Sequence, residues 1–319
     1  MRNKKVLVTG ATGFIGSHLV ERLVSIQSQV IAVGSGLGWR PNIKTLIERG
    51  EVQFVKLASF WNPKSVDRIK SCFQGVEYVV HLAYVMPNGE NLTDIASKDL
   101  NTNVLGTLTF MKLLPESVKK IIFASSCMVY GSSSTIPVSE NSNVNPGNVY
   151  SNGKFLTENY LRLFAVERNI STTALRFSTV YGPSETDPRA IPNFIRRVLA
   201  GKPPVIYGDG NDVRDYVNVK DVVAGTILAL EKDHDLFEIF NIGSGKGYST
   251  KEVAEKVILL SGKSIRPYFQ SKIGSSQKTI CDISKARKKL GYVPLIELNE
   301  GLKEEINFFL ENPRFWRER

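Results

Sequence analysis

Three side chains of this sequence, Ser126, Tyr150 and Lys154, have the types and spacing needed to move a proton to or from an oxygen atom. Tyr150 and Lys154 are four residues apart in a helical pattern, so both side chains lie on one face. A free tyrosine has a pKa of about 10 and is a poor base, but a neighbouring ammonium group favours its phenolate. Tyr150 could then exchange a proton with a substrate hydroxyl or carbonyl, while Ser126 hydrogen-bonds the same oxygen.

A glycine-rich turn near the start of the sequence offers a second part of such a site. The apolar run Val6–Val8 predicts a buried parallel strand, and an amphipathic helical pattern begins directly after the turn. Free N–H groups and the helix dipole would face an anion there, which predicts a dinucleotide site, although the bare GxxGxxG pattern also occurs in turns without a ligand. The residues expected to contact the dinucleotide in this turn are Gly10, Thr12, Gly13, Phe14, Ile15 and Gly16.

The order of apolar runs predicts the elements that bring these residues together. Apolar runs alternate with helical patterns, which implies βαβ units with right-handed crossovers. We therefore expect an α/β fold, a Rossmann-type doubly wound parallel sheet with a smaller discontinuous C-terminal lobe. The expected strands are Val6–Val8, Val30–Val33, Val52–Val55, Tyr78–Leu82, Ile121–Ala124 and Thr172–Phe177, and the expected helices include Pro63–Cys72, Leu100–Leu114 and Tyr150–Val166.

The second half of the sequence is richer in turns. It predicts a helix over Ile191–Leu199, a strand followed by a helix over Asp215–Leu230, and a strand over Phe237–Ile242. We expect residues 1–177 and 215–243 to form an NAD(P)-binding lobe. Residues 178–214 and 244–319 would then form a substrate lobe, with a ligand cleft at the carboxyl ends of the strands.

Composition and charge narrow the class of protein. The 319 residues carry a formal net charge of +10, which suits a polyanionic ligand and equally suits a solvated basic surface. We expect neither a membrane span, because no apolar run approaches about 20 residues, nor a nucleic-acid partner, because no basic block alternates with aromatics. Cys72, Cys127 and Cys281 form neither a metal-ligand spacing nor a disulfide framework, so a cytoplasmic protein without a metal is expected.

Short motifs spread over nearly the whole chain carry a family resemblance. Besides the glycine turn they include His81-Leu82-Ala83, Asn103-Val104-Leu105-Gly106-Thr107, Ser125-Ser126, Val129-Tyr130-Gly131, Val180-Tyr181-Gly182-Pro183, Tyr207-Gly208-Asp209-Gly210, Val213-Arg214-Asp215 and Asn241-Ile242-Gly243. On these motifs, with Tyr150 and Lys154, the sequence resembles the NAD-dependent epimerase/dehydratase family of extended short-chain dehydrogenases/reductases. The resemblance implies an NAD(P)-dependent enzyme that acts on a nucleotide-diphosphate sugar and forms a homodimer.

The resemblance also implies a role for each matching residue. Ser126, Tyr150 and Lys154 are the implied catalytic residues. The implied cofactor contacts beyond the glycine turn are Leu82, Ala83, Asn103, Ser125, Tyr150 and Lys154, with a structural role as the alternative for Ser125. The implied substrate contacts are Thr179, Tyr207 and Arg214. Arg214 would grip the diphosphate because its planar fork meets phosphate oxygens in pairs, and a surface pair with Asp215 is the alternative.

Two departures from the family pattern bear on cofactor and reaction. NAD-binding members usually carry an acid at the end of the second strand, where this sequence has Gly34, and Ser35 and Arg40 could accept the 2′-phosphate of NADP. We therefore expect NADP, with NAD as the alternative. The catalytic serine is followed by Cys127 and Met128 where sugar 4,6-dehydratases place Asp and Glu, which argues against dehydration.

The reaction that we expect consists of hydride transfer and hydroxyl-proton transfer at C4 of the sugar. The missing acid at Gly34 favours a 4-keto-sugar reductase that uses NADPH, and the alternative is a UDP-glucose 4-epimerase-like enzyme that retains NAD. A carbonyl reductase acting on a non-sugar is also open, although Arg214 argues against it. So is a non-catalytic dinucleotide-sensing protein, against which the intact Ser126, Tyr150 and Lys154 argue.

Overall fold

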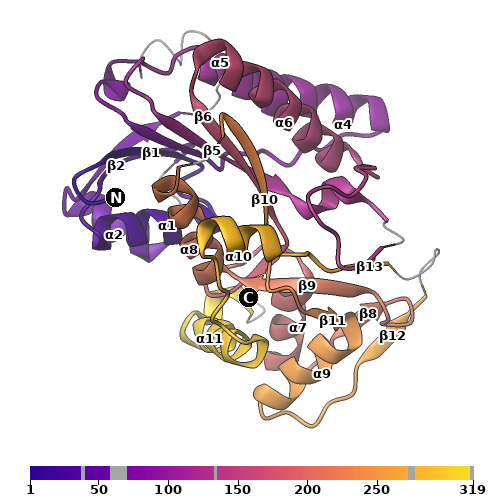
Figure 1. The fold of residues 1–319 in the computed structure, drawn as a ribbon. Helices are drawn as coiled ribbons and strands as arrows, with labels where there is room; N and C mark the ends of the chain where they lie inside the picture. Colours follow the sequence, from indigo (N-terminus) through magenta and orange to yellow (C-terminus); the bar gives the residue numbers. More distant parts are fainter. Residues whose placement is uncertain (37–39, 58–69, 133–134, 234, 272–276, 317–319) are drawn as a thin grey trace.

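A parallel sheet of seven strands runs through the larger part of the molecule in the order β10-β6-β5-β4-β1-β2-β3 (Figure 1). The computed structural model describes residues 1–36, 40–57, 70–132, 135–233, 235–271 and 277–316. The strands are β1 Lys5–Thr9, β2 Gln29–Gly34, β3 Val52–Lys56, β4 Tyr78–His81, β5 Lys120–Ser126, β6 Ser171–Phe177 and β10 Phe237–Ile242. Each strand predicted for this sheet is present, and the doubly wound parallel sheet is confirmed.

Helices cover both faces of the sheet because its strands send apolar side chains alternately into two buried layers. In β1, Val6 and Val8 pack in one layer with Leu19 and Leu23, whereas Leu7 packs in the other. The first layer includes α1 Phe14–Ser25, α2 Pro41–Glu48, α8 Val219–Glu231 and α10 Ser284–Leu290, and the second includes α5 Gly106–Met111 and α6 Val149–Arg168.

The strand order reverses direction at β1. This strand pairs with β2 on one side and with β4 on the other, so the turn that follows β1 and the segment that follows His81 emerge side by side. Ligands of doubly wound sheets bind at the carboxyl ends of the strands, at such a switch point. The glycine turn and the segment after β4 are therefore brought to one edge of the sheet.

The second half of the chain builds a smaller part with its own apolar core, in the lower half of Figure 1. Its sheets pair β9 Val213–Asn218 with β7 Thr179–Tyr181, β11 Gly247–Ser249 and β13 Lys278–Thr279, and pair β8 Val205–Tyr207 with β12 Tyr268–Gln270. Its helices are α7 Ala190–Leu199, α9 Thr250–Leu260 and α11 Leu298–Glu311, followed by the 3₁₀ turn η4 Pro313–Phe315. The predicted smaller lobe is confirmed, but its strands of two or three residues were missed because they are too short to show a periodic pattern.

Two elements bear on the expected division into lobes. Strand β9 pairs within the smaller sheet, although residues from 215 onward were assigned to the cofactor lobe. Helix α10 packs on β10 and α8, although it was assigned to the substrate lobe. The division into 1–177 with 215–243, and 178–214 with 244–319, remains a proposal.

A π-helical segment, η2 Leu100–Leu105, interrupts the helix predicted over Leu100–Leu114. It joins α4 Leu92–Asp99 to α5, so the helical run begins earlier and ends earlier than predicted. Such segments are frequent at functional sites, and this one carries Asn103. The predicted helix Pro63–Cys72 lies largely outside the described residues, which resume with the 3₁₀ turn η1 Ser71–Phe73.

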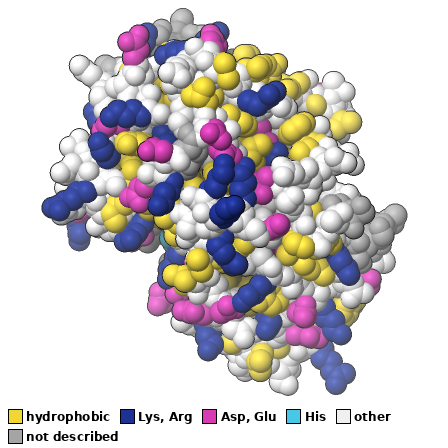
Figure 2. Space-filling view, in the orientation of Figure 1, with side chains coloured by type: hydrophobic (Ala, Val, Ile, Leu, Met, Phe, Trp, Pro, Cys, Tyr) yellow, Lys and Arg dark blue, Asp and Glu magenta, His cyan; other side chains and the backbone are white. Residues whose placement is uncertain are grey.

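Basic side chains gather near the middle of the face in Figure 2, over helix α10, whose sequence is SKARKKL. Two of them, Lys285 and Lys289, both pair with the carboxylate of Glu238 on β10. These two ion pairs favour the solvated-surface interpretation for Lys285 and Lys289. None of the described helices has the length and apolar character needed to cross a membrane.

Candidate active site

Helix α6 carries Tyr150 in its first turn and Lys154 one turn later. The helix begins there because Asn148 caps it: its side-chain oxygen accepts the N–H of Ser151 at 2.9 Å, and Ser151 Oγ accepts the N–H of Asn148 at 3.3 Å. On the buried side of the helix, Lys154 Nζ donates to the carbonyl of Ala124 on β5 at 2.7 Å. The cap and this hydrogen bond fix both side chains against the end of β5.

Ser126, the last residue of β5, completes the group. Its hydroxyl accepts the N–H of Met128 at 3.2 Å and lies near enough to the Tyr150 phenol to act on the pKa of that phenol. Burial raises the pKa of Tyr150, and the Ser126 hydroxyl acts in the opposite direction. The structure thus brings the three predicted catalytic side chains together at the carboxyl edge of the sheet.

Lys154 is the electrostatically sensitive member of this group. Burial lowers the pKa of its ammonium to about 7, while the carboxylates of Asp99 and Glu158 act to raise it. Its charge therefore depends on the surroundings near neutral pH. A neutral Tyr150 can give a proton and its phenolate can take one, and an ammonium at Lys154 favours the phenolate.

The glycine turn packs against the segment that follows β4. Gly10 has a φ of +66°, and a Cβ there would lie 2.8 Å from the backbone nitrogen of Ala83. A Cβ on Gly16 would overlap the carbonyl of Gly10, so a glycine at this position lets the helix pack closely on the turn. Helix α1 begins at Phe14 with Gly13 as its N-cap, and the free N–H groups of its first turn point out of the turn.

This arrangement fits a dinucleotide phosphate, because the turn has no side chain where the backbone must approach it. The predicted contacts Thr12, Phe14 and Ile15 lie half-buried in the turn. Leu82 and Ala83 are half-buried directly across from it, where the Ala83 N–H donates to Thr9 Oγ1 at 3.2 Å. A bound nicotinamide would supply the hydride acceptor and donor beside Tyr150 and Lys154.

The end of β2 packs closely on the glycine turn. A Cβ on Gly34 would lie 2.8 Å from Thr12 Oγ1, so a larger residue there would require the Thr12 side chain to move. Ser35 is exposed. Arg40 is buried, and its guanidinium donates to the carbonyl of Thr12 at 3.0 Å and to that of Ser184 at 3.4 Å. Arg40 thus ties the glycine turn to the segment after β7.

Asn103 lies in the π-helical segment and fastens the segment after β4. Its amide accepts the N–H of Val85 at 2.9 Å and donates to the carbonyl of Val85 at 2.8 Å and to Asp99 Oδ1 at 2.8 Å. The same Asp99 oxygen accepts the hydroxyl of Tyr84 at 2.5 Å. Sequence reasoning missed Asp99 and Tyr84; the available signal was that Asp99 precedes Asn103 by four residues in a helical pattern.

The predicted substrate residues lie on the smaller part of the molecule. Thr179 begins β7 and is half-buried, and Tyr207 ends β8 and is exposed. Arg214 on β9 donates to Thr279 Oγ1 at 3.4 Å and to Gln277 Oε1 at 3.3 Å. Asp215 turns the other way and accepts the N–H groups of residues 244, 245 and 281. The alternative of an Arg214–Asp215 surface pair is therefore wrong.

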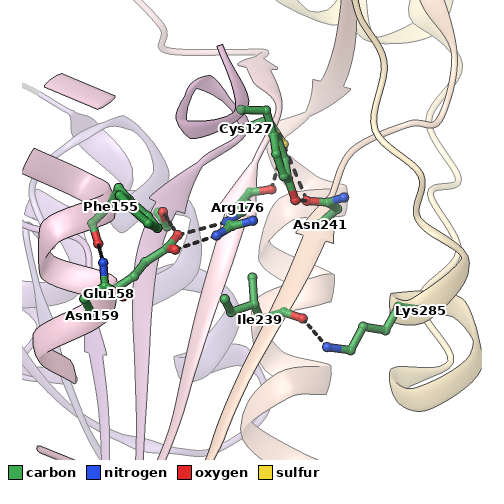
Figure 3. A network of polar contacts seen from close by, with 10 residues as sticks. Cys127, Phe155, Glu158, Asn159, Arg176, Ile239, Asn241 and Lys285 are labelled. Carbon is green, nitrogen blue, oxygen red and sulfur yellow. Dashed lines mark hydrogen bonds and ion pairs between the residues drawn. The ribbon is translucent and has the colours of Figure 1, made fainter. Parts of the chain in front are cut away.

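A buried ion pair joins α6 to β6, which lies next to β5 in the sheet (Figure 3). The guanidinium of Arg176 on β6 meets the carboxylate of Glu158 on α6 through two hydrogen bonds, of 3.0 and 2.7 Å. The hydroxyl of Ser125 also donates to Glu158. In this structure Ser125 thus has the structural contact that was the alternative to a cofactor contact.

Cys127 lies on the same buried side, away from the cleft. Its Sγ atom is 3.2 Å from the carbonyl oxygen of Arg176 and 2.7 Å from Sγ of Cys281, and both thiols are free. Burial raises the pKa of the Cys127 thiol well above its usual value. Among the described residues, no three His, Cys, Asp or Glu side chains are grouped to hold a metal ion.

Comparison with known proteins identifies the family. Residues 6–243 match the model of the NAD dependent epimerase/dehydratase family. The chain belongs to this family. The prediction of an extended short-chain dehydrogenase/reductase enzyme, made from the motifs, is thereby confirmed.

Individual relatives match along nearly their whole length. A UDP-glucose 4-epimerase from Thermotoga maritima, solved with UDP-glucose, is 34% identical with a TM-score of 0.87, covering 97% of this chain and 99% of that one. A UDP-glucuronic acid 4-epimerase from Bacillus cereus, solved with UDP-glucuronic acid and NAD, is 29% identical with a TM-score of 0.85 and the same coverage. A dTDP-4-dehydro-6-deoxyglucose reductase from Escherichia coli is 33% identical over 96% of this chain and 97% of that protein.

Proposed function

We propose that this family member is a nucleotide-diphosphate-sugar 4-epimerase that retains NAD. The observation that carries the proposal is the convergence of Ser126, Tyr150 and Lys154 at the carboxyl edge of the sheet, a group suited to moving a proton at a sugar oxygen. Cys127, the next residue after Ser126, is buried against Arg176 and Cys281. It therefore offers no proton donor to the carbon atoms of the sugar ring. Two of the similar proteins described above are 4-epimerases.

In this proposal each residue has one task. Tyr150 takes the proton of the C4 hydroxyl and later returns it to the C4 carbonyl oxygen. Ser126 holds that oxygen through its hydroxyl, and Lys154 sets the protonation of Tyr150. Arg214, whose guanidinium donates to the neutral acceptors Thr279 and Gln277, would bind the diphosphate, with Thr179 and Tyr207 as further substrate contacts.

NAD is the better supported cofactor. The NADP prediction rested on the missing acid at Gly34, but close packing against Thr12 favours a small residue at that position whichever dinucleotide binds. Arg40 uses its guanidinium on two backbone carbonyls. The similar UDP-glucuronic acid 4-epimerase carries NAD. A 4-keto-sugar reductase using NADPH is the second candidate, because the similar Escherichia coli protein is such a reductase.

The deciding experiment identifies the dinucleotide and follows the C4 hydrogen. The purified protein is denatured, and the released dinucleotide is identified by mass. The untreated protein is then given UDP-glucose, UDP-glucuronic acid or UDP-N-acetylglucosamine deuterated at C4, and the products are read by NMR. We expect bound NAD, and inversion at C4 of one of these sugars with the deuterium retained.

Other outcomes point elsewhere. A protein that is isolated empty, prefers NADPH and reduces a dTDP-4-keto-6-deoxy sugar without inverting UDP sugars is the reductase. A protein that binds neither dinucleotide contradicts both candidates, and with them the interpretation of the glycine turn.

We also propose that the molecule is a homodimer. Two neighbouring helical segments expose apolar side chains to solvent. These side chains are Leu100 and Leu105 on η2, and Leu163 and Val166 on α6. Burying these side chains against the same helices of a second copy would remove them from water. The mass of the protein in solution, measured by light scattering, tests the proposal.

A further inference from the structure

A buried carboxylate lies behind the candidate catalytic pair. Asp99, the last residue of α4, is almost completely removed from solvent, and its Oδ1 accepts hydrogen bonds from Tyr84 at 2.5 Å and from Asn103 at 2.8 Å. A Cβ on Gly153 of α6 would overlap Oδ2 of this carboxylate. Asp99 is thus packed against the backbone of the helix that carries Tyr150 and Lys154.

Tyr84, which donates to this carboxylate, joins it to both catalytic side chains. Its ring meets the Tyr150 ring edge to face, with centroids 4.9 Å apart and an interplanar angle of 85°. On its face, Lys154 Nζ lies 4.5 Å from the ring centroid. Both contacts have the geometry of attractive aromatic and cation–π interactions.

Two carboxylates act to raise the pKa of Lys154, and Asp99 has the larger effect of the two. Glu158 on α6 is held by the guanidinium of Arg176, which compensates its charge. His81 on β4 is neutral, because burial lowers its pKa to about 3. Tyr84 and Tyr150 are phenols whose pKa values are raised by burial. Asp99 accepts hydrogen bonds from the neutral donors Tyr84 and Asn103, so its negative charge acts on Lys154.

We propose that Asp99 and Tyr84 are positioning residues, with Asp99 keeping the buried Lys154 an ammonium and Tyr84 holding Lys154 and the Tyr150 ring in register. The role in catalysis rests on the proposed function, whereas the effect on Lys154 belongs to the folded chain itself. A buried ammonium with one hydrogen-bond acceptor, the carbonyl of Ala124, would lose its proton readily without a nearby negative charge.

The test replaces Asp99→Asn, which removes the charge and keeps an oxygen for Tyr84 and Asn103. The pKa of Lys154 is measured on the full-length protein by NMR of isotope-labelled lysine, with the signal assigned through a Lys154→Met variant. We expect D99N to lower this pKa by about one unit or more. Asp94→Asn, an exposed aspartate of the same helix α4, should leave it unchanged.

Turnover supplies the second readout. Because the reaction needs the ammonium, activity should fall as pH rises through the pKa of Lys154. In D99N this alkaline limb should move to lower pH by the same amount as the Lys154 titration, with KM unchanged at low pH. A loss of activity equal at every pH would instead indicate a purely structural role for Asp99 and overturn the proposal.

Tyr84 is tested independently of Asp99, which also covers the case in which D99N does not fold. Tyr84→Phe keeps the ring and should keep the pKa of Lys154 within half a unit, whereas Tyr84→Leu removes the aromatic face and should lower it. A Lys154 titration that is identical in wild type, D99N and Tyr84→Leu refutes the proposal. If no sugar is turned over at all, the proposed function fails, and the Lys154 titration still decides this inference.

Discussion

Replacing Tyr150→Phe is expected to lower turnover of the sugar by about 10²–10⁴-fold, the usual contribution of a positioned acid–base group. The phenol is the proposed proton carrier, and its ring packs edge to face on Tyr84. Phenylalanine keeps the ring contact and removes only the proton carrier. We therefore expect an unchanged fold, measured by circular dichroism, together with a nearly unchanged KM.

The matched control is Tyr78→Phe, at the opposite, amino end of β4. It makes the same chemical change far from the carboxyl edge of the sheet and should leave turnover within about twofold, like most substitutions away from a site. If Tyr150→Phe keeps more than half of the wild-type rate while Ser126→Ala does not, the proton must pass through another group, and Tyr150 is not the acid–base residue.

Glu158→Gln is expected to destabilise the protein by about 3–5 kcal/mol, because it leaves the guanidinium of Arg176 buried without a countercharge. The carboxylate accepts two hydrogen bonds from Arg176 and one from Ser125, so its loss weakens the support of β5 as well. Urea denaturation monitored by fluorescence measures the change.

Two further variants distinguish the effect of the lost ion pair on stability from the effect of changing a glutamate of helix α6. Glu167→Gln changes an exposed glutamate of the same helix and should alter stability by less than about 0.5 kcal/mol. The double substitution of Glu158→Gln with Arg176→Met removes the stranded charge and should recover much of the loss. A single Glu158→Gln variant as stable as wild type would mean that Arg176 finds another way to bury its charge.

The fold and the three central residues could be predicted because their signals are local. Val6–Val8 and Ile121–Ala124 are continuous apolar runs because parallel strands are buried on both faces. The spacing of Tyr150 and Lys154 needs one helical turn, which Asn148 starts at the required residue. The chemistry of these side chains then follows from their type.

What the sequence could not reveal depends on contacts between distant segments. Tyr84 precedes β5 in the sequence and Gly153 follows it. Neither segment has a sequence pattern that predicts that Asp99 packs between them. The same holds for Gly34, whose missing acid was interpreted as a preference for NADP. The structure shows close packing against Thr12 at that position, which only the folded turn reveals.

The overlap between Asp99 and any side chain at Gly153 also bears on how the sequence can drift over generations. A mutation of Gly153 to alanine is blocked as long as the carboxylate is present, and becomes tolerable once residue 99 is shortened. The order of mutations is then not free: position 99 must change first. Among descendants of this gene, we expect residues 99 and 153 to vary together, so that a lineage which gains a side chain at 153 has already given up the acid.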